Sequence, residues 1–421
     1  MKLSEDFIRT TEALMGRERF ERYLASFEEE APVSIRLNPQ KAAGMTVVDG
    51  ERVAWCGQGY YLPRRPQFTF DPLLHAGCYY VQEAASMFLD TVLRQHLPQQ
   101  PVAMLDLCAA PGGKSSLALS LLPPGSCLYS NEPIRSRANI LLENIAKWGD
   151  KACFVTSNYP RDYRKSRLQF DVVLCDVPCS GEGMFRKDPA TIGEWSLQNV
   201  EKCWRLQRDI VSDAWHCLRD GGLFIYSTCT FNIKENEENI HWMTTELGAQ
   251  VLPVDTKAEW QITGSLLEGF AVPVYRFIPG ITRGEGLFMC ALRKGSTEGG
   301  ARNRQTGTLA ATNRQFATSK LALSNKHASP LTFLLTPNFS LQTPNSSPVP
   351  LTYQQAMAYL RHEALMLTEG TPRGIVEVAF EGHVLGLVKN IGPRANNLYP
   401  KEWKIKTTHI PNDYEAILRP A

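Results

Sequence analysis

Two stretches of the chain place thiol side chains directly after apolar runs. In the stretch 171–183, an apolar run ends in Asp176 and, after Val-Pro, in Cys179. In the stretch 224–230, Phe-Ile-Tyr-Ser-Thr-Cys-Thr, a second run ends in Cys229. A thiolate can form a covalent bond to an electrophilic carbon, and a nearby acid can hold or move a proton. If both runs are strands of one parallel sheet, the two thiols and the carboxylate converge on the same edge.

A third stretch has the features of a cofactor site. Residues 104–115, Met-Leu-Asp-Leu-Cys-Ala-Ala-Pro-Gly-Gly-Lys-Ser, indicate a buried strand, a turn of small residues and the start of a helix. Such a turn lets a ligand approach the backbone, and a helix N-terminus offers free N–H groups. Glu132 follows Asp106 by 26 residues, near the spacing at which an acid binds ribose hydroxyls. The spacing excludes a P-loop NTPase and makes a nicotinamide cofactor a distant option. A tight turn without a ligand is the alternative interpretation.

The elements that must position these residues alternate in type. Apolar runs and segments of helical pattern follow one another, which predicts βαβ units and a mostly parallel sheet. The apolar runs are 102–107, 126–130, 152–156, 171–175 and 222–228, and the helical segments are 113–122, 133–148, 195–219 and 234–247. Ligands of such sheets bind at the carboxyl ends of the strands, where all three stretches are expected to end.

The flanking segments have other patterns. Residues 1–30 predict an acidic amphipathic helix, which short strands and a helix over 82–97 follow. Residues 294–328 carry six Lys or Arg and one acid among many small polar residues, as in a solvated linker or a basic tether that lies on phosphates. Residues 351–421 predict a small β-rich module, with a helix at 352–366 and strands at 375–380, 383–389 and 403–406.

The composition of the chain excludes several classes of protein and of site. The 421 residues include 45 Lys and Arg against 43 Asp and Glu, so any nucleic-acid partner needs a local concentration of basic residues. The eleven cysteines form no CxxC pair and the eight histidines no H-x3-H pair, so no metal site is predicted. The charged start and the lack of a long apolar stretch predict neither a signal peptide nor a membrane span. A monomeric cytoplasmic protein is expected.

The three stretches together resemble the RNA (cytosine-5) methyltransferase family, also called the NOL/Nop/Sun family. Its strings D-x-C-A-A-P-G-G-K-S/T, D-A/V-P-C-S/T-G and S/T-T-C-S/T all occur here in the family order. Val33–Pro39 is similar to its S-I-R-x-N-P string, and Gln82–Met87 to its Q-E-x-A/S-S motif. The region around Gly386-Leu387, residues 396–400 and Trp403 resembles, more loosely, the PUA-like tail of the bacterial 16S ribosomal RNA branch.

This resemblance implies an α/β fold. It consists of a Rossmann-like S-adenosylmethionine-dependent methyltransferase domain, a small α+β N-terminal domain and a β-rich PUA-like C-terminal domain. The expected boundaries are 1–97 for an N-terminal RNA-binding domain, 98–293 for the catalytic domain, 294–330 for a basic linker and 331–421 for the PUA-like RNA-binding domain.

The resemblance also implies a role for each side chain of the site. Cys229 is expected to add to C6 of a cytosine, Cys179 to assist release, and Asp176 to hold the base. Lys114 is expected near the thiolate or Asp176, where its charge would lower a thiol pKa. The residues expected to bind S-adenosylmethionine are Ala109, Ala110, Pro111, Gly112, Gly113, Lys114, Glu132, Asn158 and Asp176.

Alternative roles stay open for two pairs of neighbouring residues, and alternative identities stay open for the substrate. Family members often carry Asp for the adenine amino group where Tyr159 stands, so either Asn158 accepts that hydrogen bond or Tyr159 stacks on the ring. Arg186 and Lys187 can contact RNA phosphate or begin a solvated helix. The expected substrate is RNA, as 16S ribosomal RNA or the small ribosomal subunit. The alternatives are transfer RNA and a non-catalytic role in ribosome assembly; the residue pattern argues against a DNA or an amino-group methyltransferase.

Overall fold

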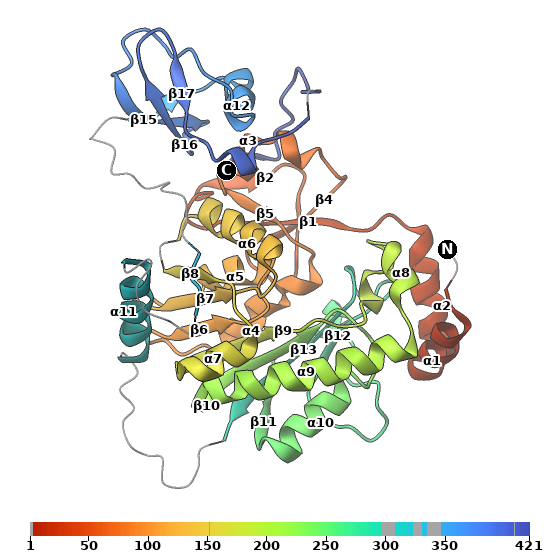
Figure 1. Cartoon of the computed structure of the whole chain (residues 1–421). Coiled ribbons are helices and arrows are strands. Elements are labelled where there is room, and N and C mark those ends of the chain that lie inside the picture. The colour runs from red at the N-terminus through yellow and green to blue at the C-terminus, as the bar shows by residue number, and fades with distance from the viewer. Residues whose placement is uncertain (1–2, 151, 296–307, 323–330, 335–346, 408) are drawn as a thin grey trace.

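The computed structural model describes residues 3–150, 152–295, 308–322, 331–334, 347–407 and 409–421. A central α/β domain lies beneath a small N-terminal domain, and a C-terminal module sits on that N-terminal domain (Figure 1). No helix in these ranges is long and apolar enough to cross a membrane.

The central sheet has the order β11-β13-β10-β9-β6-β7-β8, and β12 pairs with β13. Its five parallel strands are β6 (Ala103–Asp106), β7 (Cys127–Asn131), β8 (Cys153–Thr156), β9 (Phe170–Asp176) and β10 (Leu218–Thr228). The antiparallel strands are β11 (Ala249–Leu252), β12 (Tyr275–Phe277) and β13 (Leu287–Lys294). The strand order reverses direction between β6 and β9, and a crevice for ligands forms at such a switch point. The predicted α/β class is confirmed.

Helices cover both faces of this sheet because its buried strands are apolar on both sides. In β9, Val172 and Leu174 belong to one hydrophobic core, whereas Val173 and Cys175 belong to the other. The first core includes α4 (Leu89–His96), α5 (Gly113–Leu119) and α6 (Arg135–Trp148). The second includes α7 (Pro160–Ser166), α9 (Leu197–Cys217) and α10 (Glu237–Glu246). The short helix α8 spans Ala190–Glu194.

The N-terminal domain differs in two places from the prediction. The single helix expected over residues 1–30 is broken into α1 (Glu5–Met15) and α2 (Arg17–Ala25), because Gly16 takes a φ of 75° that ends the first helix. The helix expected over 82–97 is reduced to a 3-10 turn and α4. A sheet of order β3-β4-β1-β5 follows α2, with strands Glu51–Arg52, Gly59–Leu62, Val33–Leu37 and Tyr79–Val81, and α3 spans Pro72–His75.

Part of the segment predicted as a solvated linker packs on the central domain instead. Helix α11 (Thr308–Ala322) buries Ala310, Asn313 and Ala317 against the sheet, and the hydroxyl of Tyr129 donates to the carbonyl of Asn313 at 2.5 Å. Small side chains on one face allow this close approach, although the overall composition is polar. Residues 331–334, expected in the C-terminal domain, lie along the edge of β8. The remaining residues of 296–307 and 323–330 lie outside the described ranges.

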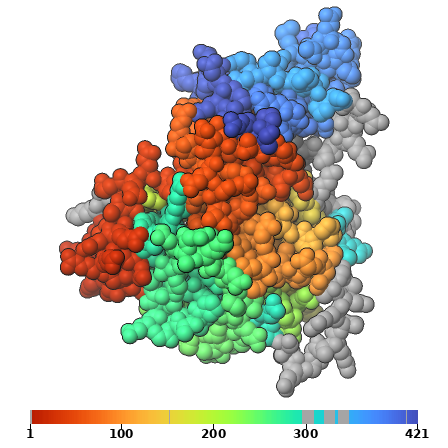
Figure 2. Space-filling view, turned by 180° about the vertical axis from the view of Figure 1, so that it is seen from behind, coloured from red at the N-terminus to blue at the C-terminus, as the bar shows by residue number. Residues whose placement is uncertain are grey.

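The C-terminal module is docked, not loosely tethered. Its elements are β14 (Val349–Pro350), α12 (Tyr353–Leu360), β15 (Gly374–Phe380), β16 (His383–Asn390) and β17 (Ala395–Asn397), and the expected strand at 403–406 is absent from this described region. The last strand, β18 (Leu418–Pro420), pairs antiparallel with β2 (Met45–Val47) of the N-terminal domain. Both domains contribute to one hydrophobic core, and Figure 2 shows the blue module directly on the orange-red N-terminal domain.

Candidate active site

Strands β9 and β10 bring the two thiols of the site together. Their register pairs Asp176 with Ser227, so the loops after both strands start at the same level of the sheet. The sulfur atoms of Cys179 and Cys229 lie 3.1 Å apart, and the backbone N–H of Cys229 points to the sulfur of Cys179 at 3.3 Å. The convergence expected from a parallel sheet is therefore present in the structure.

The surroundings make the two thiols unequal. The hydrogen bond to Cys229, together with burial and the charge of Cys229, raises the pKa of the Cys179 thiol well above its ordinary value. Its surroundings therefore favour the protonated form of the Cys179 thiol.

Lys114 and Asp176 form an ion pair beside the thiols. Nζ of Lys114 lies 2.8 Å from Oδ2 of Asp176, with 14% of the lysine side chain and 33% of the aspartate side chain exposed. Burial alone would lower the pKa of Lys114, but Asp176, with smaller contributions from Asp106 and Cys229, more than offsets it and raises that pKa. The site thus contains a cation next to both a carboxylate and a thiol.

Two buried glutamates hold the thiol loops in a reciprocal arrangement that the sequence did not reveal. Glu182, from the loop of Cys179, accepts from the loop of Cys229: the backbone N–H groups of Phe231 at 2.7 Å and Asn232 at 2.9 Å. Its second oxygen accepts from the Trp195 indole at 2.9 Å and from the Asn232 amide at 3.0 Å. Four donors therefore fix one carboxylate between the two loops.

Glu235 makes the reciprocal contact, from the loop of Cys229 to the loop of Cys179. It follows Cys229 in the chain and accepts from the backbone N–H of Ser180, next to Cys179, at 3.0 Å. It also accepts from Gln207 at 2.6 Å and from Asn232 at 2.8 Å. Burial raises the pKa of Glu235 to about 7, although these hydrogen bonds oppose the shift. We name Glu182 and Glu235 the carboxylate clamp.

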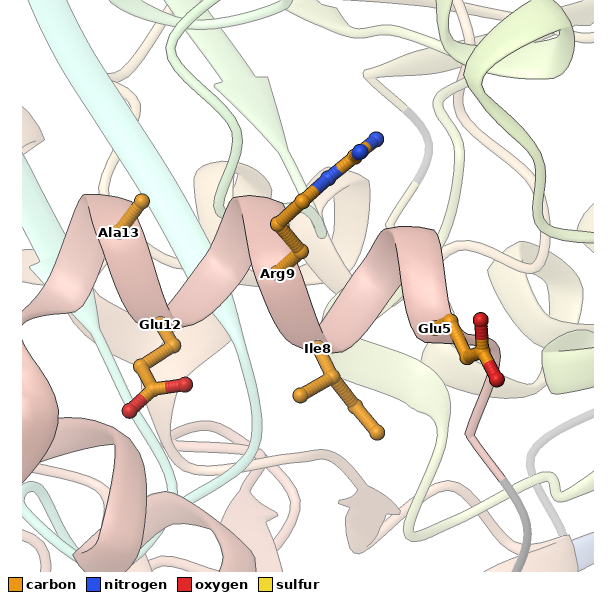
Figure 3. Close-up of a pocket in the computed structure, with 5 residues that line it drawn as sticks. All are labelled: Glu5, Ile8, Arg9, Glu12 and Ala13. Atoms are coloured by element: carbon orange, nitrogen blue, oxygen red, sulfur yellow. The ribbon is translucent and has the colours of Figure 1, made fainter.

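A close backbone approach and an outer helix complete the support of these loops. A Cβ atom at Gly183 would lie 2.5 Å from the Cα of Gly286, so only glycine fits there. Helix α1 covers the loop through Phe7, whose ring lies 5.0 Å from that of Phe185. The outward face of α1 carries only a shallow hollow, which is formed by side chains of that one helix, Glu5, Ile8, Arg9, Glu12 and Ala13 (Figure 3).

The turn between β6 and α5 has the shape of a ligand cradle. Gly112 has a φ of 116°, and a Cβ atom there would lie 3.1 Å from Leu141. Asp106 below it is fully buried; one carboxylate oxygen accepts from Ser115 at 2.6 Å, and the other has no hydrogen-bond partner within the described ranges. Burial raises the pKa of Asp106 to about 7. An unsatisfied buried oxygen beside a glycine turn fits a polar ligand group.

Neighbouring elements hold this cradle from two sides. Glu132, directly after β7, is buried; it accepts from the N–H of Ile134 at 3.0 Å and lies 3.4 Å from Arg137. From the N-terminal domain, buried Arg36 donates to the hydroxyl of Ser116 at 2.6 Å and to the carbonyl of Gly113 at 3.3 Å. The S-I-R-x-N-P string thus contributes an arginine that braces the start of α5.

Asn158 does not have the free side chain that the sequence led us to expect. Its amide donates to the carbonyl of Thr332 at 3.2 Å, and its oxygen accepts from the N–H of Thr332 at 2.7 Å. The segment 331–334, which the sequence placed in another domain, makes these bonds. Tyr159 is 58% exposed and lies 5.2 Å from the Arg161 guanidinium, so its ring points to solvent in this structure.

The structure contradicts both roles that the sequence suggested for Arg186. Its side chain is only 7% exposed and pairs with Glu285 at 3.0 Å, and it donates to the carbonyls of Ser26 and Gly284. It is therefore neither part of a solvated helix start nor available to an RNA phosphate, whereas its neighbour Lys187 is exposed. Sequence alone cannot distinguish a buried arginine from a surface one without knowledge of its distant acid.

The fold and the site together define a class of protein. A doubly wound parallel sheet with a glycine cradle at its switch point is the architecture of Rossmann-like methyltransferases, and this one carries two thiols beside the cradle. Residues 3–84, 93–293 and 346–405 match, in turn, the family models for the N-terminal domain of 16S rRNA methyltransferase RsmF, 16S rRNA methyltransferase RsmB/F and the methyltransferase RsmF PUA domain. The chain belongs to the RsmB/F methyltransferase family, which confirms the predicted family and fold class.

Curated relatives share the same description. Ribosomal RNA small subunit methyltransferase F of Enterobacter sp. (strain 638) is 31% identical over 300 residues, which cover 67% of this chain and 61% of the relative. The protein of that name from Aliivibrio salmonicida is 34% identical over 257 residues, which cover 58% of this chain and 52% of the relative. The chain thus spans about half to three fifths of the length of these relatives.

Solved structures support the fold. A methyltransferase homologue from Pyrococcus horikoshii superposes with a TM-score of 0.56 at 24% identity, over 69% of this chain and 100% of that chain. NSun6 from the same organism, solved with SFG, gives a TM-score of 0.57 at 20% identity, over 70% of this chain and 99% of that chain.

Proposed function

We propose that this protein transfers a methyl group from S-adenosylmethionine to C5 of a cytosine in 16S ribosomal RNA. The observation that carries the proposal is the pair of sulfur atoms 3.1 Å apart, next to the Lys114–Asp176 ion pair and the glycine cradle. Cytosine C5 is a weak nucleophile, and covalent addition of a thiolate at C6 activates it. A single thiol can add to the ring, but a second group is needed to remove the C5 proton.

The cradle fits the cofactor in its polar and its steric features. The unpartnered oxygen of buried Asp106 can accept from an ammonium group, and Glu132 can accept from ribose hydroxyls at the next strand end. S-adenosylmethionine, when bound, supplies the methyl group. The residues proposed to hold it are Ala109, Ala110, Pro111, Gly112, Gly113, Lys114, Glu132 and Asp176, and Asn158 would first have to exchange its bonds to Thr332.

The chain's own residues then act in sequence. The sulfur of Cys229 bonds to C6, while Asp176 and Lys114 hold the N3 and N4 edge and stabilise the charge that moves into the ring. Once Cys229 is bonded to C6, Cys179 releases its own proton to solvent. After C5 has accepted the methyl group, the Cys179 thiolate takes the C5 proton, the electron pair of that C–H bond re-forms the ring double bond, and the C6–sulfur bond breaks. Cys229 leaves as a thiolate.

The electrostatics of the pair explain how Cys179 becomes a base only after addition. Cys229 is the largest cause of the raised pKa of Cys179. Once the sulfur of Cys229 is bonded to C6, the hydrogen bond between the two thiols is lost, and the pKa of Cys179 falls from its raised value. The second thiol is therefore activated by the first covalent step.

The substrate proposal follows from the family. Its model and the relatives above are described as acting on 16S or small-subunit ribosomal RNA, and a PUA-type domain adds a second RNA-binding module. Such a substrate implies a cytoplasmic site of action. Transfer RNA is the second candidate, and the monomeric state stays a prediction.

The test combines two cysteine variants with product analysis. Unmodified 16S ribosomal RNA, transfer RNA and DNA are incubated with S-adenosylmethionine and the wild-type chain, and nucleosides are analysed by mass spectrometry. We expect 5-methylcytidine only in ribosomal RNA. On denaturing gels, Cys179→Ala should accumulate a covalent protein–RNA adduct, and Cys229→Ala should form none while it still binds the cofactor.

Two results would contradict the proposal. An adduct with Cys229→Ala and none with Cys179→Ala would reverse the two thiol roles. A lack of 5-methylcytidine in naked ribosomal RNA and in small subunits, with cofactor binding intact, would favour the non-catalytic RNA-binding role.

A further inference from the structure

An open groove of about 560 Å³ lies where the N-terminal domain meets the C-terminal module. One wall is the loop 65–70, and the other is the segment Ile405–Thr407, more than 330 residues further along the chain. The proposed catalytic site lies at the ends of β9 and β10 and uses no residue of this groove. The groove is therefore a separate feature that the catalytic proposal does not explain.

The two domains that form the walls of the groove are joined by direct contacts. Strand β18 pairs with β2, and the hydroxyl of Tyr414 donates to Asp71 at 3.2 Å. Phe68 and Ile405, one from each wall, belong to the same hydrophobic core. Neither domain alone would form this surface.

The charges on the groove are of one sign. Arg65 and Lys406 are exposed, one on each wall, and neither forms an ion pair with a described residue, although the Arg65 guanidinium lies 5.6 Å from the Phe68 ring. Exposed Gln67, Thr69 and Thr407 add hydrogen-bonding groups, and none of the described residues that line the groove is acidic.

The positive charge is confined to the groove, because acidic residues line the adjacent hollow. Asp71, Asp413 and Glu415 line that hollow, and Arg64, next to Arg65, is neutralised there by Glu415 at 2.5 Å. An anionic ligand is therefore attracted to the groove and repelled from its immediate neighbour.

We propose that this groove binds a single-stranded part of the RNA substrate, with phosphates against Arg65 and Lys406. The inference rests on the proposed RNA substrate and specifies where part of it lies. The charge favours a polyanion, and the half-buried ring of Phe70 suits an unstacked base. A duplex would present its phosphates but keep its bases stacked.

The expected effect follows from counterion release. Two phosphate contacts on a single strand contribute about 1.4 to the slope of log affinity against log salt, which is about a tenfold change in Kd at ~0.15 M salt. The full-length Arg65→Gln/Lys406→Gln variant should therefore bind about tenfold more weakly, with a salt slope reduced by about 1.4.

The measurement is fluorescence anisotropy without cofactor, between about 0.05 and 0.2 M salt. The probes are a labelled single strand of about 20 nucleotides from 16S ribosomal RNA and a duplex of equal length. The matched control is Arg9→Gln/Lys257→Gln, which removes the same charge from side chains that are 71% and 69% exposed and do not line the groove. We expect near wild-type binding for the control, and a smaller loss for the duplex with the groove variant.

Equal affinities of the groove variant and the control would overturn the proposal, and equal losses for strand and duplex would overturn its single-strand part. The methylation assay separates this result from the proposed function. A groove-dependent affinity without 5-methylcytidine would support the groove and refute the reaction. Methylation by the wild type, with an unchanged Kd in the groove variant, would support the reaction and refute the groove.

Discussion

The carboxylate clamp makes a quantitative prediction for Glu182→Gln. The buried carboxylate accepts four hydrogen bonds, two from backbone N–H groups of the Cys229 loop and two from the side chains of Trp195 and Asn232. A glutamine can keep its carbonyl oxygen on the backbone pair, but its amide then faces the other two donors. The Trp195 indole loses its acceptor, whereas the Asn232 amide can still donate to Glu235, and the remaining bonds are no longer charge-assisted.

The cost follows from the number of bonds changed. A buried donor without an acceptor costs about 1–3 kcal/mol, so we expect Glu182→Gln to lower the free energy of unfolding by roughly 2 kcal/mol. The Cys229 loop should also shift, and a displacement of about 1 Å at a reacting atom can reduce the rate about a hundredfold.

Urea unfolding and single-turnover methylation measure the two effects. The control is Glu259→Gln, whose side chain is 73% exposed and lies 3.7 Å from Lys257, and it should change stability by less than about 0.5 kcal/mol. If Glu182→Gln unfolds within about 0.5 kcal/mol of wild type, the clamp does not hold the loops as described. A large loss of stability with an unchanged methylation rate would refute its role in positioning Cys229.

Two further predictions concern the charges of the site. A double-mutant cycle of Lys114→Met and Asp176→Asn should give a coupling of roughly 1–2 kcal/mol in unfolding free energy, reduced by the exposure of Asp176; a coupling near zero would mean that the pair is absent in solution. Because the pKa of Glu235 is raised from 4.5 to about 7, its contribution to stability is present below about pH 4.5 and is lost as the pH rises through 7. Glu235→Gln should therefore gain stability relative to wild type between about pH 5 and pH 8 in urea unfolding, and a constant difference would contradict the shift.

The sequence alone determined the central fold and the convergence of the two thiols. Apolar runs that alternate with helical segments require buried parallel strands, and such strands deliver their next residues to one edge of the sheet. That rule was sufficient to bring Cys179, Cys229 and Asp176 to one place. Local pattern carries this information because strand and helix periodicity reside in neighbouring residues.

Only the tertiary structure decided which polar residues are buried and by what they are held. Glu182 and Glu235 look like ordinary acids in the sequence, and Arg186 like an ordinary surface cation. Their burial depends on hydrogen-bond partners up to 160 residues away in the chain. A one-dimensional pattern does not encode such pairings.

The same reason explains the misplaced segments. The small residues of α11 resembled a solvated linker, since its packing depends on the opposite face of the sheet. The sequence did not predict the last strand, β18, because its partner β2 lies near the other end of the chain. Secondary structure thus follows from neighbouring residues in the sequence. The packing of distant segments depends on the surfaces that the folded sheet presents.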